Sequence, residues 1–405
     1  MGEWKTYRLE ELCTAKGSYG IGAPAVAYDV NKYTYLRITD INDDGTLNHN
    51  GLMSVDDERA GDYLLKENDI VFARTGNSTG RTYFYDGRDG ELVYAGFLIK
   101  FSLDSEKVNP RILKYYTHSQ PYYDWVRSFD TGGTRGNINA KVFGAMPITL
   151  PPRHQQDRIV EILKSLDDKI ELNRRLNANL EAQAQALFRS WFVDFEPFRD
   201  GPFVDSELGK IPQGWKVGNY TDIVEIKGGG TPKTGIQEYW DGTIPFFSPK
   251  DVGASCFVLD TEKRITAKGL ENCNSSLFQP NTVFITARGT VGKVVMTGAE
   301  MAMNQTNYAL LGKQNISQYY VYHITLQLVA RLLKKANGAV FNAITTRDFT
   351  SEQIIIPPFA TIRQFSDVVK PIYENILLND VQSNRLSALR DTLLPKLMAG
   401  EINLH

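Results

Sequence analysis

The chain has 405 residues, of which 42% are hydrophobic, 23% charged and 11% aromatic. This composition excludes a mainly disordered or fibrous chain and indicates a globular protein of two or more domains. Lys and Arg total 45 against 47 Asp and Glu, a net charge of -2, which excludes a general polycationic attraction to nucleic acid. Any binding of nucleic acid must therefore come from local patches.

Cysteine content and hydropathy narrow the class further. The three cysteines share no C-x-x-C spacing, which argues against a disulfide framework and against a structural zinc site. The first residues contain no apolar stretch typical of a secretory signal, and no later segment reaches the roughly 18 apolar residues of a membrane span. We therefore expect a cytoplasmic protein that does not enter the membrane.

The sequence contains one plan twice. Three segments recur after 206 to 213 residues: Trp4-Lys5 as Trp215-Lys216, residues 68–80 as residues 281–292, and Pro151-Pro152 as Pro357-Pro358. Separations of this length indicate the duplication of a domain-sized unit with small loop insertions, rather than a short-period solenoid.

The predicted elements follow this duplication in chain order. Residues 1–150 carry short β-branched and aromatic runs between Gly, Asn and Asp turns, which predicts a mixed α/β unit. An apolar 3,4 spacing then predicts a long helix over residues 151–195. We expect a linker and a second mixed unit over 196–356, and a second long helix over 357–405.

The two predicted helices share one apolar seam, because adding 206 to each seam position of the first helix gives a seam position of the second helix. Antiparallel packing is expected, since the first helix leads into the second unit and the second helix follows that unit. Two unrelated amphipathic helices are the alternative. The expected seam residues are Ile159, Ile162, Leu166, Asn173, Leu176, Leu180 and Leu187, then Phe365, Val368, Ile372, Asn379, Leu386, Leu389 and Leu393.

Two features of this seam are polar or irregular. Asn173 and Asn379 stand at matched positions, either as buried residues that fix the register or at the solvent edge. Pro371 lies inside the second helix, where the missing backbone donor should kink or interrupt it.

Catalytic motifs are not found in the sequence. The stretch Gly289-Thr290-Val291-Gly292-Lys293 is too short for a P-loop, and the five histidines have no metal-ligand spacing. We interpret the chain as non-catalytic, with no metal site of its own.

Polar, glycine-flanked cationic segments repeat instead. Glycine lets a backbone approach a phosphate closely, and Thr, Arg and Lys side chains can then donate to it. A solvated turn is the alternative interpretation. The candidate DNA contacts are Arg74, Thr75 and Arg81 in the first unit, and Arg288, Gly289, Thr290 and Lys293 in the second.

A second matched set lies nearer the end of each unit. Arg can read guanine and Asn or Gln can read adenine in the major groove, although capping and turn roles are alternatives. These candidates are Arg135, Asn137 and Lys141, then Asn304, Gln305, Asn342 and Arg347. Residues 1–150 carry 17 basic and 20 acidic side chains, so the isolated first unit should bind DNA poorly.

The helical segments resemble the specificity subunit of type I restriction-modification systems. The residues that carry the resemblance are Gln156–Leu163, Asp167–Leu176, Gln185–Phe195 and the C-terminal Leu393–Ile402. The resemblance implies an α+β fold with two pseudo-symmetric target-recognition domains, each reading half of a bipartite double-stranded DNA site. It also implies that the two antiparallel helices form a coiled-coil spacer that docks two methyltransferase subunits.

Further expectations come from the same resemblance. S-adenosylmethionine, ATP and Mg²⁺ would serve the methyltransferase and restriction/translocase subunits and would not bind this chain. Thr75-Gly76 and Arg288-Gly289-Thr290 match the family's Gly-Thr turn, and Asn304-Gln305 matches a recurrent Asn-Gln, where the first unit reads Ala95-Gly96. A coiled-coil scaffold or orphan adaptor without DNA specificity is the alternative; a fused single-chain enzyme would need a methyltransferase motif.

Overall fold

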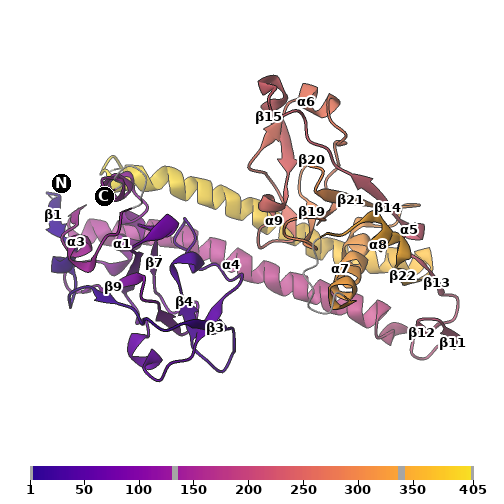
Figure 1. The fold of residues 1–405 in the computed structure, drawn as a ribbon, viewed down its shortest axis with the longest axis horizontal. Coiled ribbons are helices and arrows are strands. Elements are labelled where there is room, and N and C mark those ends of the chain that lie inside the picture. Colours follow the sequence, from indigo (N-terminus) through magenta and orange to yellow (C-terminus); the bar gives the residue numbers. More distant parts are fainter. Residues whose placement is uncertain (1–2, 130–135, 336–342, 403–405) are drawn as a thin grey trace. The chain divides into compact units, whose positions relative to one another are not determined.

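The computed structural model describes residues 3–129, 136–335 and 343–402 (Figure 1). The chain divides into two compact units: unit 1 is Met1–Asp168 with Leu386–His405, and unit 2 is Lys169–Arg385. Both boundaries fall inside the long helices rather than at the Pro-Pro pairs. Each unit therefore contains a globular part together with part of each long helix, because those helix turns share a core with the globular part of that unit.

Unit 1 is built on two four-stranded sheets, in the orders β2-β9-β6-β7 and β3-β5-β4-β8, and on an antiparallel pair of β1 with β10. Strand β6 is buried at every position because its sequence, DIVFA, is almost wholly apolar. The elements are β1 (Lys5–Arg8), β2 (Ser18–Tyr19), β3 (Ala25–Ala27), β4 (Thr34–Leu36), β5 (Met53–Val55), β6 (Asp69–Ala73), β7 (Thr82–Phe84), β8 (Leu92–Tyr94), β9 (Leu98–Ser102), α1 (Pro110–Tyr116), α2 (Gln120–Arg127), α3 (Ala140–Gly144) and β10 (Pro147–Leu150).

Unit 2 has sheets in the orders β14-β21-β18-β19-β16 and β17-β15-β20, and β13 pairs antiparallel with β22. A separate hairpin, β11-β12, precedes them. The elements are β11 (Phe203–Ser206), β12 (Gly209–Pro212), β13 (Lys216–Asn219), α5 (Tyr220–Ile223), β14 (Val224–Gly228), β15 (Trp240–Phe247), β16 (Phe257–Val258), β17 (Arg264–Ile265), α6 (Ala267–Glu271), β18 (Val283–Thr286), β19 (Val294–Thr297), β20 (Ala302–Met303), β21 (Asn307–Gly312), α7 (Gln318–Lys335), α8 (Thr346–Ser351) and β22 (Gln353–Ile356).

Backbone conformation confirms the internal repeat. Asn68 and Asn281 have φ of 72° and 68°, a left-handed conformation that Asn tolerates better than most residues. Gly80 and Gly292, at the other end of the repeated segment, have φ of 86° and 85°. The strands agree as well, because β6 lies between β9 and β7 as β18 lies between β21 and β19. The expected α+β class with two mixed units is confirmed.

The two long helices are α4 (Arg153–Phe192) and α9 (Phe359–Met398), each of 40 residues. In unit 1 the first turns of α4 share a core with the last turns of α9, through Leu163 and Leu394. In unit 2 the last turns of α4 share a core with the first turns of α9, through Phe188 and Phe365. Within each unit the two helices therefore pack antiparallel, as expected.

The predicted interruption at Pro371 is wrong, because α9 continues through it without a break. Pro371 cannot donate to the carbonyl of Asp367 one turn earlier. Both residues lie on the exposed side of α9, where water can donate to that carbonyl instead.

The buried face of the helices differs from the predicted seam at three residues. Leu176, Val368 and Leu389 are 43%, 46% and 47% exposed, so their assignment to the seam is wrong. The other predicted seam residues are buried or half-buried: Ile159, Ile162, Leu166, Asn173, Leu180, Leu187, Phe365, Ile372, Asn379, Leu386 and Leu393.

The buried residues that the predicted seam missed include Leu163, Asp167, Asn177, Ala184 and Phe188 on α4, with Val369, Tyr373, Ile376, Leu394 and Leu397 on α9. Several of these buried residues are polar or small. The apolar pattern in the sequence therefore predicts a seam that is shifted by one residue at these positions. Offsets of 206 still relate Leu163 to Val369 and Phe188 to Leu394.

Asn173 follows the buried alternative, whereas Asn379 is half-buried and makes a polar contact with the facing helix. Asn173 is fully buried in unit 2, and its Nδ2 donates to Gln382 Oε1 at 2.9 Å and to Ser383 Oγ at 3.2 Å. Asn379 Nδ2 donates to Asn177 Oδ1 at 2.8 Å. Such polar contacts between facing helices favour one register, because a slip would leave buried polar atoms without partners.

Candidate nucleic-acid interface

Three segments of unit 1 that are far apart in sequence meet at one edge. The loop after β6 is joined to the turn after β8, because Arg74 N–H donates to Phe97 O at 3.1 Å. It is also joined to the segment before α3, because Ile138 N–H donates to Arg74 O at 3.0 Å. We call this surface, made of Tyr19, residues 74–81, 95–97 and 136–141, the unit 1 edge.

The two arginines of this loop have different surroundings. Arg81 forms an ion pair with Asp43 at 2.7 Å and donates to Ile41 O at 3.1 Å, so its guanidinium is held within unit 1. The Arg74 guanidinium lies over the ring of Tyr19, 5.1 Å from its centroid. Arg74 Nε is buried without a hydrogen-bond partner, and Arg74 forms no ion pair with any residue that the structure describes. Arg74 is therefore the more available cation of the two.

The remaining candidates of the unit 1 edge differ in exposure. Thr75 is half-buried and precedes a short 3-10 turn, whereas Asn137 and Lys141 are exposed. The capping alternative does not apply to Asn137, because Asn139 caps α3 by accepting from Val142 N–H at 3.0 Å. Arg135 lies outside the described residues.

Unit 2 joins the corresponding segments in the same way. Ala287 N–H donates to Thr306 O at 2.9 Å, and Ile344 N–H donates to Ala287 O at 2.9 Å. We call residues 287–293, 303–306 and 343–347 the unit 2 edge. Its exposed candidates are Arg288, Gly289, Thr290, Lys293, Gln305 and Arg347, whereas Asn342 lies outside the described residues.

Asn304 supports the unit 2 edge rather than projecting from it. Its Oδ1 accepts from Thr306 N–H at 3.0 Å, from Thr306 Oγ1 at 2.7 Å and from Asn307 Nδ2 at 2.7 Å. A bidentate contact with adenine needs both the oxygen and the nitrogen of an amide. Asn304 could make that contact only by giving up the bonds that shape its own loop. Gln305, by contrast, is exposed and accepts a hydrogen bond from the Thr231 hydroxyl.

Close backbone packing sets the position of both edges. A Cβ atom on Gly20 would lie 2.2 Å from Tyr94 O, and one on Gly229 would lie 2.2 Å from Asn304 O. Only glycine fits at either position, and the two positions correspond in the repeat. Tyr19 and Phe97, which no sequence motif singles out, are exposed beside Gly20 and Gly96. The signal that could have found Phe97 is its position in the repeat, equivalent to Thr306.

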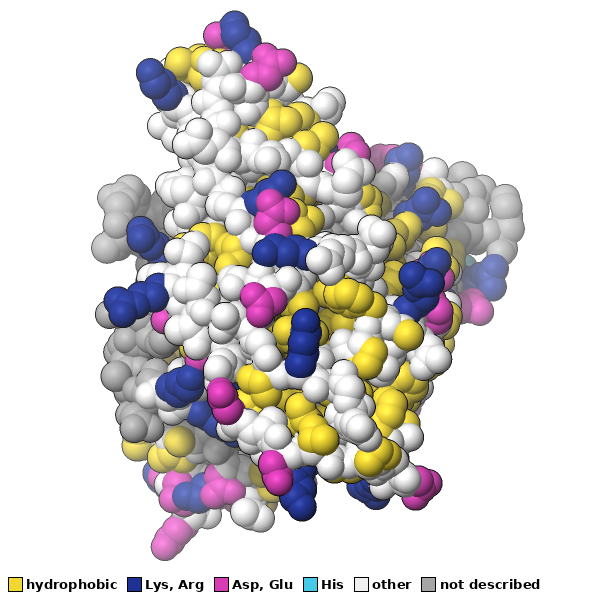
Figure 2. Space-filling model, turned by 90° about the vertical axis from the view of Figure 1, so that its right-hand side faces the viewer, with side chains coloured by type: hydrophobic (Ala, Val, Ile, Leu, Met, Phe, Trp, Pro, Cys, Tyr) yellow, Lys and Arg dark blue, Asp and Glu magenta, His cyan; other side chains and the backbone are white. Residues whose placement is uncertain are grey.

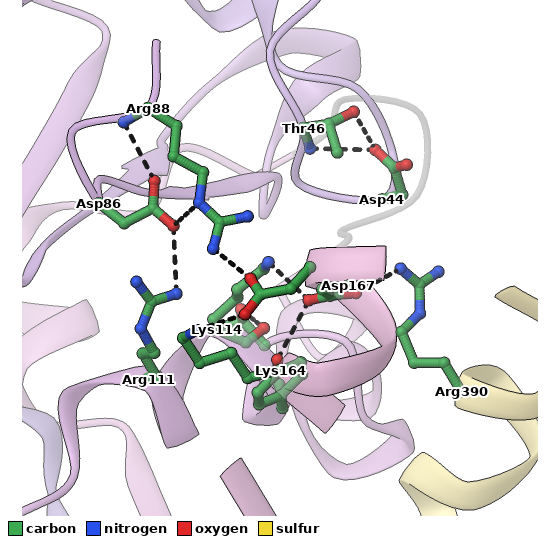
Figure 3. A network of polar contacts seen from close by, with 12 residues as sticks. Asp44, Thr46, Asp86, Arg88, Arg111, Lys114, Lys164, Asp167 and Arg390 are labelled. Carbon is green, nitrogen blue, oxygen red and sulfur yellow. Dashed lines mark hydrogen bonds and ion pairs between the residues drawn. The ribbon is translucent and has the colours of Figure 1, made fainter. Parts of the chain in front are cut away.

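An ionic network joins the parts of α4 and α9 that belong to unit 1 to its globular part (Figure 3). Asp167 of α4 accepts from Lys114 Nζ at 2.7 Å and from Arg390 Nη1 of α9 at 3.0 Å. Burial by itself would raise the pKa of the Asp167 carboxyl, but Lys114 and Arg390 outweigh burial and hold this pKa below its ordinary value. Arg88 and Arg111 both pair with Asp86 nearby, each at 3.1 Å.

Unit 2 has aromatic groups where unit 1 has this network. Tyr373 and Ala184 stand at the positions equivalent to Asp167 and Arg390. The Tyr373 hydroxyl is 2.8 Å from Nε2 of His323, and the His323 ring stacks on Phe188 with centroids 4.9 Å apart. Burial lowers the pKa of His323 to about 3, so its imidazole is neutral at pH 7.

Charge on the surface is dispersed in the view that Figure 2 gives. Lys and Arg side chains are scattered there among Asp, Glu and apolar side chains rather than gathered into one positive field. Each edge instead offers exposed hydrogen-bond donors on a fixed backbone.

The described part of the chain also bears on metal sites and membrane spans. Within residues 3–129, 136–335 and 343–402, no group of three His, Cys, Asp or Glu is placed to hold a metal ion. No helix in these ranges is long and apolar enough to cross a membrane.

The chain is similar in sequence to a known family and to individual members of it. Residues 1–182 and 212–387 match the family described as type I restriction modification DNA specificity domain. The type I restriction enzyme HindI specificity subunit of Haemophilus influenzae is 25% identical over 99% of this chain and 100% of its own length. The MjaIX specificity subunit of Methanocaldococcus jannaschii is 27% identical over 72% of this chain and 69% of its own.

A solved structure has a similar fold. The crystal structure of a type I restriction-modification system S subunit from M. genitalium aligns with a TM-score of 0.54. The alignment covers 98% of this chain and 96% of that one at 15% identity.

Proposed function

This chain belongs to the family of type I restriction modification DNA specificity domains, and from that membership we propose how its two units read DNA. The chain is a non-catalytic DNA specificity subunit, and each unit recognises one half of a bipartite target through its own edge. The observation that carries this proposal is that one edge is built twice on a single chain, by equivalent backbone bonds at Arg74 and at Ala287.

The residues of each edge divide the work. Arg288, Thr290 and Lys293 are exposed around two glycines of positive φ, where a phosphate can approach the backbone, and they contact the DNA backbone. Gln305 and Arg347 are exposed beside them and read base edges. Asn304 holds the shape of the loop. In unit 1, Thr75, Asn137 and Lys141 contribute to binding, and Arg81 stabilises its own loop.

Partners supply what the chain lacks. The net charge of -2 is too low for strong phosphate binding by this chain alone, so a methyltransferase subunit contributes much of the phosphate contact. DNA and the methyltransferase are the partners, and two methyltransferase copies dock on α4 and α9. The restriction/translocase subunits complete the complex in the cytoplasm. S-adenosylmethionine, ATP and Mg²⁺ serve those subunits.

The test is to co-express the chain with its cognate methyltransferase subunit in a methylation-free host and to map N6-methyladenine. A split motif with a fixed gap is the expected result. A complex that forms but methylates no defined motif would contradict DNA reading by this chain and would favour the alternative of a coiled-coil scaffold.

A further inference from the structure

The unit 1 edge carries two aromatic side chains that folding leaves exposed. Phe97 is 56% exposed and Tyr19 is 43% exposed. The equivalent residues of unit 2 are Thr306, whose carbonyl accepts the same backbone bond, and Gly228, which takes the same place in its strand pair. Exposed apolar side chains that gather at one place indicate an interaction surface. The two units therefore present different chemistry on the same scaffold.

Both rings stand on a rigid backbone. The Tyr19 hydroxyl accepts from Ala140 N–H at 3.1 Å, which fixes the direction of the ring. The turn that carries Phe97 is closed by Gly96 N–H donating to Ile21 O at 2.8 Å. Rings on a fixed backbone lose little conformational freedom when they bind, so the exposed area contributes efficiently to recognition.

Arg74 completes the group. Its guanidinium lies over Tyr19, and its backbone donates to the carbonyl of Phe97. Arg74 has no ion pair with a described residue that would have to break first, unlike Arg81. A planar guanidinium can donate two parallel hydrogen bonds to O6 and N7 of guanine, and an apolar ring can pack on the methyl group of thymine.

We propose that Tyr19, Arg74 and Phe97 form the base-reading group of unit 1, an inference that rests on the proposed function. The two terminal nitrogens of Arg74 donate to a guanine in the major groove. Phe97 packs on the 5-methyl group of a neighbouring thymine. Tyr19 is a positioning residue that holds the guanidinium over its ring.

The experiment maps N6-methyladenine for single variants co-expressed with the cognate methyltransferase subunit. We expect Phe97→Ala to reduce the preference for thymine at one position of one half-site about tenfold, and Arg74→Lys to do so for a guanine in the same half-site. Tyr19→Leu should relax the position read by Arg74, whereas Tyr19→Phe, which keeps the ring and loses only the hydrogen bond from Ala140, should relax it less.

The control is Tyr28→Ala, which removes an aromatic side chain of similar exposure, 55%, in unit 1 but outside the unit 1 edge. It should leave both half-sites unchanged. An unchanged motif for both Phe97→Ala and Arg74→Lys would overturn the inference. A uniform loss of methylation with the same base preferences would also overturn it, because that pattern indicates phosphate contact. If the wild-type complex methylates no motif, the failure lies in the proposed function itself.

Discussion

Asp167 is the residue on which the polar contacts of unit 1 converge (Figure 3). It is 9% exposed and is surrounded by Lys114, Arg390 and the hydroxyl of Tyr115, which donates at 3.1 Å. A carboxylate in such a site is stable only because its partners compensate for lost hydration. Removing it leaves Lys114 without an ion pair among the described residues, and it leaves Arg390 paired only with the exposed Asp391.

We expect Asp167→Asn to lower the free energy of unfolding of unit 1 by about 2 to 3 kcal/mol. Loss of one member of a fully buried pair costs about 3 to 5 kcal/mol, and partial exposure of Lys114 and Arg390 reduces this. Urea unfolding would measure it. The matched control is Asp168→Asn on the same helix, where a 38% exposed carboxylate should contribute less than about 1 kcal/mol. Equal effects of the two variants would contradict a special role for Asp167.

The titration of a second residue, His323, should make the stability of unit 2 depend on pH. Its pKa is about 3 in the folded chain, against an ordinary value of 6.5. Between these two values the unfolded chain binds a proton that the folded chain does not, so stability falls as pH is lowered from 6.5 towards 3. The slope should approach about 1.4 kcal/mol per pH unit.

The test compares this slope in the wild type and in His323→Phe, each measured by chemical unfolding from pH 7 to pH 4. His118 in unit 1 also has a lowered pKa, about 4, but it contributes to both proteins and cancels in the difference. A variant with the wild-type slope would show that His323 does not titrate in this way.

At the scale of elements, the sequence predicts the length of the two long helices, but its apolar pattern does not identify all the residues of their buried face. Positions such as Asp167, Asn177 and Ala184 are buried because partners from the facing helix accept or surround them. Leucines one residue away are partly exposed instead. Helix α9 also tolerates Pro371, because the lost bond lies on its exposed side.

We therefore expect Pro371→Ala to stabilise the chain. The substitution restores a backbone donor and removes a ring that crowds the preceding turn, an effect of about 1 to 3 kcal/mol in a helix interior. Thermal unfolding of unit 2, which contains Pro371, should therefore have a higher midpoint in the variant than in the wild type. The control is Lys370→Ala, a neighbouring exposed position whose change should be small. A lower midpoint for Pro371→Ala would mean that the proline shapes the helix.

For the whole molecule, duplication gives the chain two units built on the same plan. Strand β1 pairs with β10, from Lys5 opposite Leu150 to Arg8 opposite Pro147, so both ends of residues 1–150 lie together. Residues 1–150 can therefore be exchanged at one place in the fold, provided that their contacts with Leu394 and Leu397 of α9 are kept.

Replacing residues 1–150 by the corresponding segment of another family member should change one half of the methylated motif and leave the other half unchanged. Methylation mapping of the chimera would measure both halves. The converse chimera, with unit 2 exchanged, serves as the control and should change the opposite half. A change in both halves, or in neither, would contradict independent reading.

The sequence by itself determined the duplication, the two long helices and the position of the glycine-flanked loops. These features depend on local periodicity and on residue types such as glycine and asparagine, and the family resemblance drawn from the helical segments was confirmed. Only tertiary structure decided which helix face is buried, because Asp167 is compensated by Arg390, 223 positions away. It also decided that Arg81 is paired, that Asn304 supports its own loop and that Tyr19 and Phe97 are exposed. Contacts between distant segments set those outcomes, and no local pattern encodes them.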